Sequence, residues 1–397
     1  MRQWLHLLGL ALLTSTVPGC SAGVSTPPQP QASTLAAVPK ASQDGNLVLL
    51  AGKLRNSARA PVAIVQLGDS HTAADIFSGE LRRLLQAQYG DGGIGLVPAT
   101  SVPGIRNDRV IINSEARQWQ LVSARNQQSS QFPLGGYLSL PQAARPMVKL
   151  QARDADAQRY KVSALYQATA NATLVANGNQ RRMLPATGGE WRFSPAFVNL
   201  GLPLQMSVEA GQGVALGGWY LQGQKNAGVT YSSLGINGAR LEVVDKWQAG
   251  WQESLKALRP DLLILAYGTN EAFDDKLDLD LYQSQLDATL TRLRQDLPRA
   301  AILLVGPPDS IKQRKARSCA ARQPQPLAAV VRIQRQLAHK HKALFWDWQR
   351  YMGGPCSIAA WQDGGLARGD LVHLTAEGYR KSAAGLYAFL KGPLGLR

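Results

Sequence analysis

Three polar residues in two distant segments of the sequence could together cleave an ester. Ser70 follows a Gly-Asp pair at the end of an apolar run, and its hydroxyl is a weak nucleophile that needs a base within hydrogen-bonding reach. Asp370 precedes His373 by three residues, a spacing that lets a carboxylate orient an imidazole and stabilise its charged form. We therefore expect Ser70 to act as the nucleophile, His373 as the base and Asp370 as the partner of His373.

The other histidines are weaker candidates for the base. His339 and His341 fall late in an amphipathic stretch beside lysines, which is typical of a helix surface. His71 adjoins the nucleophile, and the side chain of a direct neighbour usually points elsewhere. His373 remains the best candidate.

An ester hydrolase also needs hydrogen-bond donors for the negative charge that develops on the carbonyl oxygen. Asn270 follows the apolar run 261–267, and its side-chain amide is such a donor. A glycine in the loop after residues 228–233 would let a backbone N–H approach a substrate closely. Gly235 and Gly238 can both fill this role, and the spacing alone does not choose between them.

These residues need a sheet of parallel strands to bring them together. Apolar runs alternate with amphipathic stretches in the first and last parts of the sequence, which predicts a doubly wound parallel sheet. The expected strands are 61–67, 228–233, 261–267, 301–306 and 343–348, and the expected helices are 74–89, 240–258, 281–297, 325–342 and 375–391. Ligands bind at the carboxyl ends of such strands, where Ser70 and Asn270 stand.

The sequence between residues 105 and 225 has a different pattern. It lacks an amphipathic helix, and Gly, Pro and Asn separate short β-like runs at 108–113, 147–152, 160–168 and 203–209. This spacing is typical of a β-sandwich. We expect an α/β fold in which residues 46–104 and 226–397 form one split domain and residues 105–225 form an inserted all-β domain.

The composition excludes several classes of protein. The chain has 397 residues, of which 45% are hydrophobic, too many for a disordered protein. It has 43 Lys and Arg against 27 Asp and Glu, and the net charge of +16 attracts polyanions. The densest basic cluster, residues 312–317, is more typical of a solvated loop than of a binding site. We expect no nucleic-acid partner and make no prediction of oligomeric state.

The N-terminus has the pattern of an export signal. Arg2 precedes a short apolar segment, and small residues and Cys20 follow it. The stretch before Cys20 resembles a bacterial lipobox, whose cysteine is lipidated; ordinary cleavage near Ala22 is the alternative. We expect residues 1–20 to direct the chain to the periplasm or envelope of a Gram-negative bacterium, and residues 21–45 to form a flexible linker. The lipid would be the chain's only contact with the membrane.

Two cysteines remain after the export signal is removed. Cys319 and Cys356 are both in the C-terminal part of the chain. In an oxidising compartment two such cysteines form a disulfide, and the alternative is a pair of buried free thiols. We expect the disulfide, joining two C-terminal loops.

The polar segments resemble the conserved blocks of the SGNH (GDSL-type) hydrolases. In that family a Ser in a Gly-Asp-Ser block is followed by a Gly, by an Asn in a Gly-x-Asn block and by Asp-x-x-His. Ser70, Gly238, Asn270, and Asp370 with His373 match this order. The resemblance implies an acyl-enzyme mechanism, and an oxyanion hole formed by the backbone N–H groups of Ser70 and Gly238 and by the Asn270 side chain.

Within this family the sequence most resembles bacterial periplasmic peptidoglycan O-acetylesterases. The resemblance rests on segments 68–71, 89–93 and 267–271 and on the β-insertion, and it covers most of residues 46–397. It implies removal of acetyl groups from the C6 hydroxyl of muramic acid and an insertion similar to a carbohydrate-binding module. Aromatic side chains of the insertion could stack on sugars, although we expect most in the core: Trp119, Tyr137, Tyr166, Trp191, Phe193, Trp219 and Tyr220.

Other functions remain open at this point. The same site could deacetylate or acetylate another exported polysaccharide of the alginate or cellulose type, because hydrolysis and transfer share the acyl-enzyme. A glycan-binding protein with a silent hydrolase fold is a third hypothesis. We expect no metal or cofactor, because no spacing of ligands matches a zinc signature.

Overall fold

The computed structural model describes residues 44–129, 131–209 and 211–396. The predicted export segment, Cys20 and residues 21–43 of the predicted linker lie outside these ranges. Helix α1 (Gly45–Arg55) begins the described chain, one residue before the predicted start of the fold, and the Asp44 side chain caps it by accepting from the Asn46 N–H. No helix in the described ranges is both long and apolar enough to cross a membrane.

Five parallel strands form the centre of the α/β half. Their order is β14-β1-β15-β16-β17, and all four neighbouring pairs are parallel. The predicted strands are confirmed to within a few residues at β1 (Pro61–Gly68), β14 (Gly228–Gly235), β15 (Leu262–Ala266), β16 (Ala301–Val305) and β17 (Leu344–Trp346).

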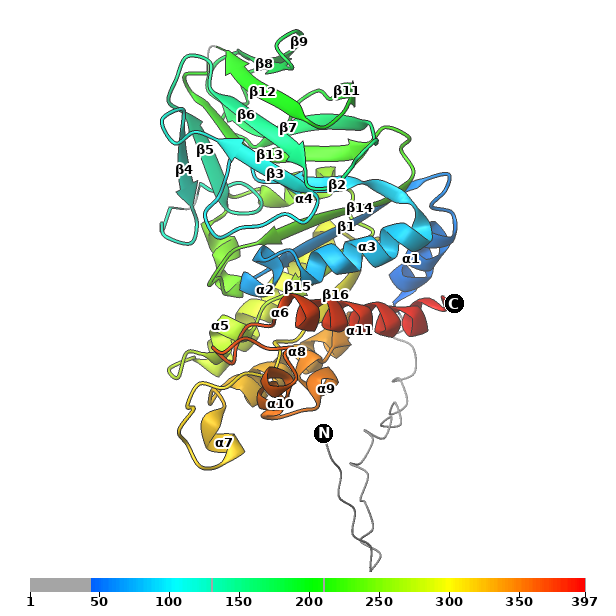
Figure 1. Ribbon diagram of the computed structural model, residues 1–397, viewed down its shortest axis with the longest axis vertical. Coiled ribbons are helices and arrows are strands. Elements are labelled where there is room, and N and C mark those ends of the chain that lie inside the picture. The colour runs from blue at the N-terminus through cyan, green and yellow to red at the C-terminus, as the bar shows by residue number, and fades with distance from the viewer. Residues whose placement is uncertain (1–43, 130, 210, 397) are drawn as a thin grey trace, which may run out of the picture. The chain divides into compact units, whose positions relative to one another are not determined.

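Side chains on the two faces of these strands pack into two separate hydrophobic cores, so both faces of the sheet are covered. In β1, Val62 and Ile64 pack into one core, and Val65 and Leu67 into the other. Helices α1, α3 and α11 contribute to the first core, and α4, α6 and α8 to the second (Figure 1). Their bounds are α3 Phe77–Tyr89, α4 Trp251–Ala257, α6 Leu279–Asp296, α8 Leu327–Lys340 and α11 Ala376–Leu394.

The prediction of one helix over residues 240–258 is wrong. The chain forms a 3₁₀ helix η1 (Leu241–Lys246) and then α4, which Gly250 precedes in a left-handed conformation with φ of 86°. Trp247 between them is buried and meets Trp251 edge to face. The remaining helices are short: α2 (Ser70–Ala73), α5 (Thr269–Ala272), α7 (Cys319–Arg322), α9 (Trp348–Met352) and α10 (Ser357–Asp363).

The insertion is a two-layer β-structure, as predicted. One layer is a five-stranded antiparallel sheet with the order β3-β6-β12-β8-β9. The other contains β10, β7 and β13, and one hydrophobic core lies between the layers. The strands are β3 (Val110–Ser114), β4 (Trp119–Ser123), β5 (Tyr137–Pro141), β6 (Met147–Ala152), β7 (Tyr160–Ala168), β8 (Ala172–Ala176), β9 (Gln180–Leu184), β10 (Arg192–Phe193), β11 (Phe197–Leu200), β12 (Leu204–Glu209) and β13 (Val214–Gly223).

One strand joins the two halves into a single sheet. Strand β2 (Asp91–Val97) pairs in parallel with β14 and antiparallel with β13. The hydrogen-bonded order therefore runs without a break from β17 through β1 and β2 to β10. Residues 105 and 225 stay a prediction for the ends of the inserted domain.

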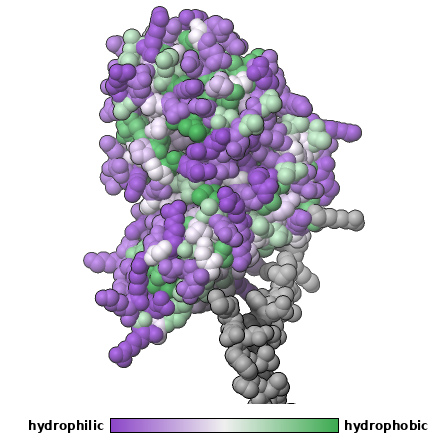
Figure 2. All heavy atoms as spheres, viewed as in Figure 1, coloured by the Kyte–Doolittle hydropathy of each residue, from purple (hydrophilic) through white to green (hydrophobic). Residues whose placement is uncertain are grey.

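Most aromatic residues of the insertion are buried. Trp119, Tyr137, Tyr166, Trp191 and Trp219 are all buried. On the face drawn in Figure 2 hydrophilic residues predominate and hydrophobic ones are scattered. Trp119, Tyr166 and Trp219 pack in the core between the two layers, and Tyr137 and Trp191 pack in the core that also contains α4. As expected for most of the set, these five side chains are not free to stack on a sugar.

Candidate active site

Ser70 stands on a tight turn at the carboxyl end of β1. The Asp69 carboxylate accepts a hydrogen bond from the His71 N–H at 2.9 Å and so caps helix α2, of which Ser70 is the first residue. A Cβ atom on Gly68 would lie 2.1 Å from Thr72 Oγ1 and 2.8 Å from the Ala266 carbonyl. Only glycine fits there, and the turn places Ser70 at the edge of the sheet.

The three predicted residues form a hydrogen-bonded relay. Ser70 Oγ lies 3.0 Å from His373 Nε2, and His373 Nδ1 lies 2.8 Å from Asp370 Oδ2. Asp370 Oδ1 also accepts from the N–H groups of Val372 and His373. Such an arrangement can move a proton from the serine hydroxyl to the imidazole.

The charge state of Asp370 determines which ring nitrogen of His373 carries the proton. Burial acts to raise the pKa of Asp370, but the hydrogen bonds from His373 and Val372 outweigh it and hold the pKa below its ordinary value. The carboxylate is therefore ionised at neutral pH and accepts from His373 Nδ1–H. Nε2 is then left free to accept the proton of Ser70.

Short-range contacts hold the loop that carries Asp370 and His373. The Arg368 N–H donates to the His373 carbonyl at 2.8 Å, and the Leu371 N–H donates to the Arg368 carbonyl. Leu371 has a φ of 59°, a conformation that is costly for a leucine and persists only where surrounding contacts impose it. Its side chain is buried, so burial and hydrogen bonding together set the direction of the loop.

The candidate oxyanion residues follow the two strands beside β1. Gly68 pairs with Gly235 at the end of β14 and with Ala266 at the end of β15, so their loops emerge at the same edge. One amide hydrogen of Asn270 is donated to the Ala239 carbonyl at 2.8 Å, which leaves the second for a ligand. Among the described residues, no acceptor pairs with the N–H of Ser70 or of Gly238.

The two candidate glycines have different surroundings. A Cβ on Gly235 would lie 2.2 Å from the Ala73 nitrogen, so this glycine lets α2 pack against β14. The Gly235 carbonyl accepts from the Tyr137 hydroxyl at 3.2 Å. Gly238 lies in the loop beyond, with a φ of 73° and an N–H without an acceptor among the described residues. The geometry therefore favours Gly238 for the oxyanion hole.

His71 is a site residue for which the sequence predicted no role. Its ring is buried, Nδ1 lies 2.8 Å from the Tyr379 hydroxyl, and its centroid is 5.2 Å from that of His373. Burial, followed by the charge of His373, lowers the pKa of His71 to about 3. His71 is therefore neutral and does not oppose the positive charge that His373 acquires when it accepts a proton.

Glu271 is a second residue that the sequence left without a function. Its carboxylate is buried, and Oε1 accepts from the Leu241 N–H at 2.8 Å. Together with the bond from Asn270 to Ala239, this contact ties the Gly238 loop to helix α5. Burial raises the pKa of Glu271 to about 7.

We expect Glu271→Gln to stabilise the protein at alkaline pH. The folded state keeps the Glu271 proton up to about pH 7, against an ordinary pKa of 4.5. The folded state therefore binds more protons in this window, and the free energy of unfolding falls as pH rises through it. A shift of this size corresponds to about 3 kcal/mol. Gln retains the acceptor for Leu241, so the variant should melt at a higher temperature than wild type at pH 8 and at a similar temperature at pH 4.5.

Thermal unfolding of both proteins across this pH range measures the effect. Glu242→Gln is the matched control, because Glu242 lies next to the same contact but is exposed. Equal melting temperatures of Glu271→Gln and wild type at pH 8 would contradict the raised pKa of the buried Glu271 carboxylate.

Two family models match the chain over adjoining ranges. Residues 92–205 match the N-terminal region of peptidoglycan O-acetylesterases. Residues 208–381 match the GDSL-like lipase/acylhydrolase family. No curated protein matches the chain.

Solved structures give a more complete match. A peptidoglycan O-acetylesterase is 33% identical, covers 89% of this chain and 97% of its own, and has a TM-score of 0.77. An acetyl xylan esterase is 18% identical over 41% of this chain and 81% of its own, with a TM-score of 0.33. A family two carbohydrate esterase from Clostridium thermocellum is 12% identical over 73% of this chain and 100% of its own, with a TM-score of 0.31. The identity and coverage of the first show that the chain belongs to the peptidoglycan O-acetylesterase family of GDSL-type hydrolases.

Proposed function

We propose that this protein hydrolyses O-acetyl esters of peptidoglycan, at the C6 hydroxyl of muramic acid, with Ser70 as the nucleophile. The observation that carries the proposal is the relay from Ser70 through His373 to Asp370, at 3.0 and 2.8 Å. The solved relative, a peptidoglycan O-acetylesterase that aligns over nearly its whole length, supports the substrate.

The relay supplies each proton that the first half-reaction needs. Ser70 Oγ attacks the acetyl carbon while His373 Nε2 takes the hydroxyl proton, and a tetrahedral oxyanion forms. The bond between the acetyl carbon and the sugar oxygen then breaks. His373 returns the proton to that oxygen, which leaves the free sugar hydroxyl and an acetyl group on Ser70.

Water completes the cycle by the same route. His373 takes a proton from the water as it attacks the acetyl carbon, and then gives that proton to Ser70 Oγ as acetate leaves. Asp370 stays ionised throughout and stabilises the imidazolium that forms twice.

The N–H groups of Ser70 and Gly238 and the second amide hydrogen of Asn270 would bind the oxyanion. Donors that are fixed before the reaction stabilise this charge without reorganising. The bonds from Asn270 to Ala239 and from Leu241 to Glu271 support this role, because they hold the loop before a substrate arrives.

We also propose that the protein is exported and that Cys20 is lipidated. The N-terminal pattern supports export, and an oxidising compartment is where a disulfide such as Cys319–Cys356 persists. Fatty-acid labelling of the full chain, with Cys20→Ser as the control, tests the lipid; equal labelling of both would contradict it.

Acetate release tests the substrate. Purified protein should release acetate from O-acetylated peptidoglycan and not from acetylated alginate supplied at the same acetyl concentration. Release from alginate alone would assign the enzyme to an exported polysaccharide instead. Release from neither, with a small acetyl ester still hydrolysed, would contradict the proposed polymer while leaving the catalytic relay in place.

A further inference from the structure

The basic cluster at residues 312–317, here called the basic loop, lies between β16 and α7. The sequence from Ser310 to Trp346 contains no acidic residue. Arg314, Lys315 and Arg317 are exposed, and none of them makes an ion pair within the described residues. These three charges are therefore available to a ligand.

The basic loop borders the active site. It follows the carboxyl end of β16, at the same edge of the sheet as Ser70. The Ile311 N–H donates to the carbonyl of Leu371, the residue after Asp370, at 2.9 Å. Lys312 Nζ donates to the carbonyl of Phe273, which ends helix α5, at 2.8 Å. The loop thus contacts the helix that carries Asn270, and Ile311, the residue directly before the loop, contacts the segment that carries His373. Figure 1 draws α7 and α5 on the same side.

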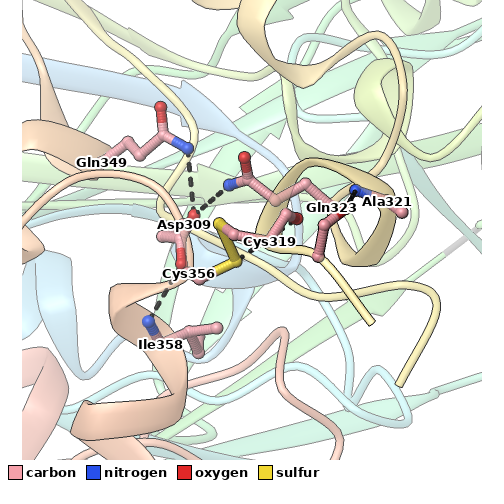
Figure 3. Close-up of a disulfide and its surroundings, with 8 residues drawn as sticks. Asp309, Cys319, Ala321, Gln323, Gln349, Cys356 and Ile358 are labelled. Carbon is pink, nitrogen blue, oxygen red and sulfur yellow. Dashed lines mark hydrogen bonds between the residues drawn. A yellow bond between two sulfur atoms is a disulfide. The ribbon is translucent and has the colours of Figure 1, made fainter. Parts of the chain in front are cut away.

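The base of the loop is fixed, unlike that of an ordinary solvated loop. The Cys319–Cys356 disulfide joins α7 to the start of α10. The buried Asp309 carboxylate accepts from the side-chain amides of Gln323 and Gln349 at 2.5 and 3.0 Å and from the Ile358 N–H at 2.9 Å (Figure 3). A loop held at both ends keeps its charges near the active site.

We propose that the basic loop binds the carboxylates of the peptide stems of peptidoglycan and so holds the glycan strand over Ser70. This inference rests on the proposed function, because it assumes that the substrate is a polymer with regularly spaced carboxylates. A strand with many carboxylates can contact several cations at once, and separate weak contacts then add into useful affinity. The interaction lies at the surface, so salt should weaken it.

The test neutralises the loop without touching the catalytic residues. The loop variant carries Arg314→Gln, Lys315→Gln and Arg317→Gln. We expect KM for O-acetylated peptidoglycan to rise about fivefold to tenfold at low salt, with little change in kcat. Hydrolysis of 4-nitrophenyl acetate, which is small and uncharged, should be unchanged. In 0.5 M salt the difference between variant and wild type should nearly vanish.

A matched control removes the same charge from the opposite edge of the sheet. Arg59, Arg259 and Arg299 are exposed, lie shortly before β1, β15 and β16, and make no ion pair within the described residues. Their triple replacement by Gln should leave KM for peptidoglycan close to the wild-type value. An equal rise in KM in the control and in the loop variant would overturn the proposal, because the effect would then come from net charge.

Binding without turnover separates this proposal from the proposed function. When intact peptidoglycan sacculi are sedimented, wild type should sediment with them and the loop variant should stay in the supernatant. Sacculi stripped of their peptide stems should bind both proteins poorly. This pattern supports the loop even if wild type releases no acetate, a result that would contradict only the function. Two results would overturn the proposal that the basic loop binds the peptide stems. One is equal binding of wild type to stripped and intact sacculi, and the other is a loop variant that sediments like wild type.

Discussion

Ser70→Ala should lower kcat for O-acetylated peptidoglycan by about 10⁴-fold or more while the protein stays folded. The relay has no other acceptor for the acetyl group, and loss of the nucleophile in comparable serine hydrolases costs several orders of magnitude. Within the described residues, the only side-chain hydrogen bond of Ser70 is the one to His373, and alanine is a good residue for the first turn of α2. Acetate release and thermal unfolding of the same sample measure the two effects.

Ser233→Ala is the matched control for the identity of the nucleophile. Ser233 lies near the end of β14, the strand beside β1, and its hydroxyl is 2.9 Å from Ser78 Oγ. Its loss should cost at most a small part of the activity. Ordinary turnover by Ser70→Ala, or a loss by Ser233→Ala of the same size, would contradict the assignment of Ser70.

The parallel core could be predicted because its strands are buried on both faces. Such strands are continuous apolar runs, as in β1 and β15, and the helices between them show apolar residues on one side. Their order along the chain then places Ser70 and Asn270 at one edge by the general rule for such sheets. The position of the site therefore followed from local pattern alone.

Strand β2 could not be predicted, because its glycine-rich sequence is not typical of a strand. The expected helix over 74–89 ends just before this stretch, and no strand is expected there. Gly92 needs to be glycine because a Cβ there would lie 2.7 Å from the Gly228 carbonyl carbon. Gly93 has a φ of 126°. Close approach of neighbouring backbones explains these glycines, and that approach depends on β14 and β13, which are far away in the sequence.

The supporting residues of the site were also beyond prediction. A histidine next to a nucleophile and a glutamate next to an asparagine have no distinctive pattern, and both acquire their properties from burial. His71 is neutral because Tyr379, from the last helix, and the surrounding core exclude water from it. Glu271 accepts from the N–H of Leu241, the first residue of η1, and this contact joins two segments that lie 30 residues apart in the sequence.

Asp370→Asn should lower kcat by about 10³- to 10⁴-fold without a large loss of stability. The Asn carbonyl can still accept from the N–H groups of Val372 and His373, as Asp370 Oδ1 does. The amide nitrogen, however, would take the place of Oδ2, 2.8 Å from His373 Nδ1. It would donate to Nδ1 and so move the ring proton to Nε2, where His373 can no longer accept the proton of Ser70.

Steady-state kinetics on a small acetyl ester and on peptidoglycan, with thermal unfolding, measures this change. The loss should be the same for both substrates, since it concerns the proton on His373 and not the binding of the polymer. Asp363→Asn is the matched control, because Asp363 lies on the same segment, at the end of α10, and is exposed; it should keep wild-type kcat. Near-normal turnover by Asp370→Asn would mean that the carboxylate does not set the tautomer of His373. A loss confined to peptidoglycan would instead place Asp370 among the residues that bind the polymer.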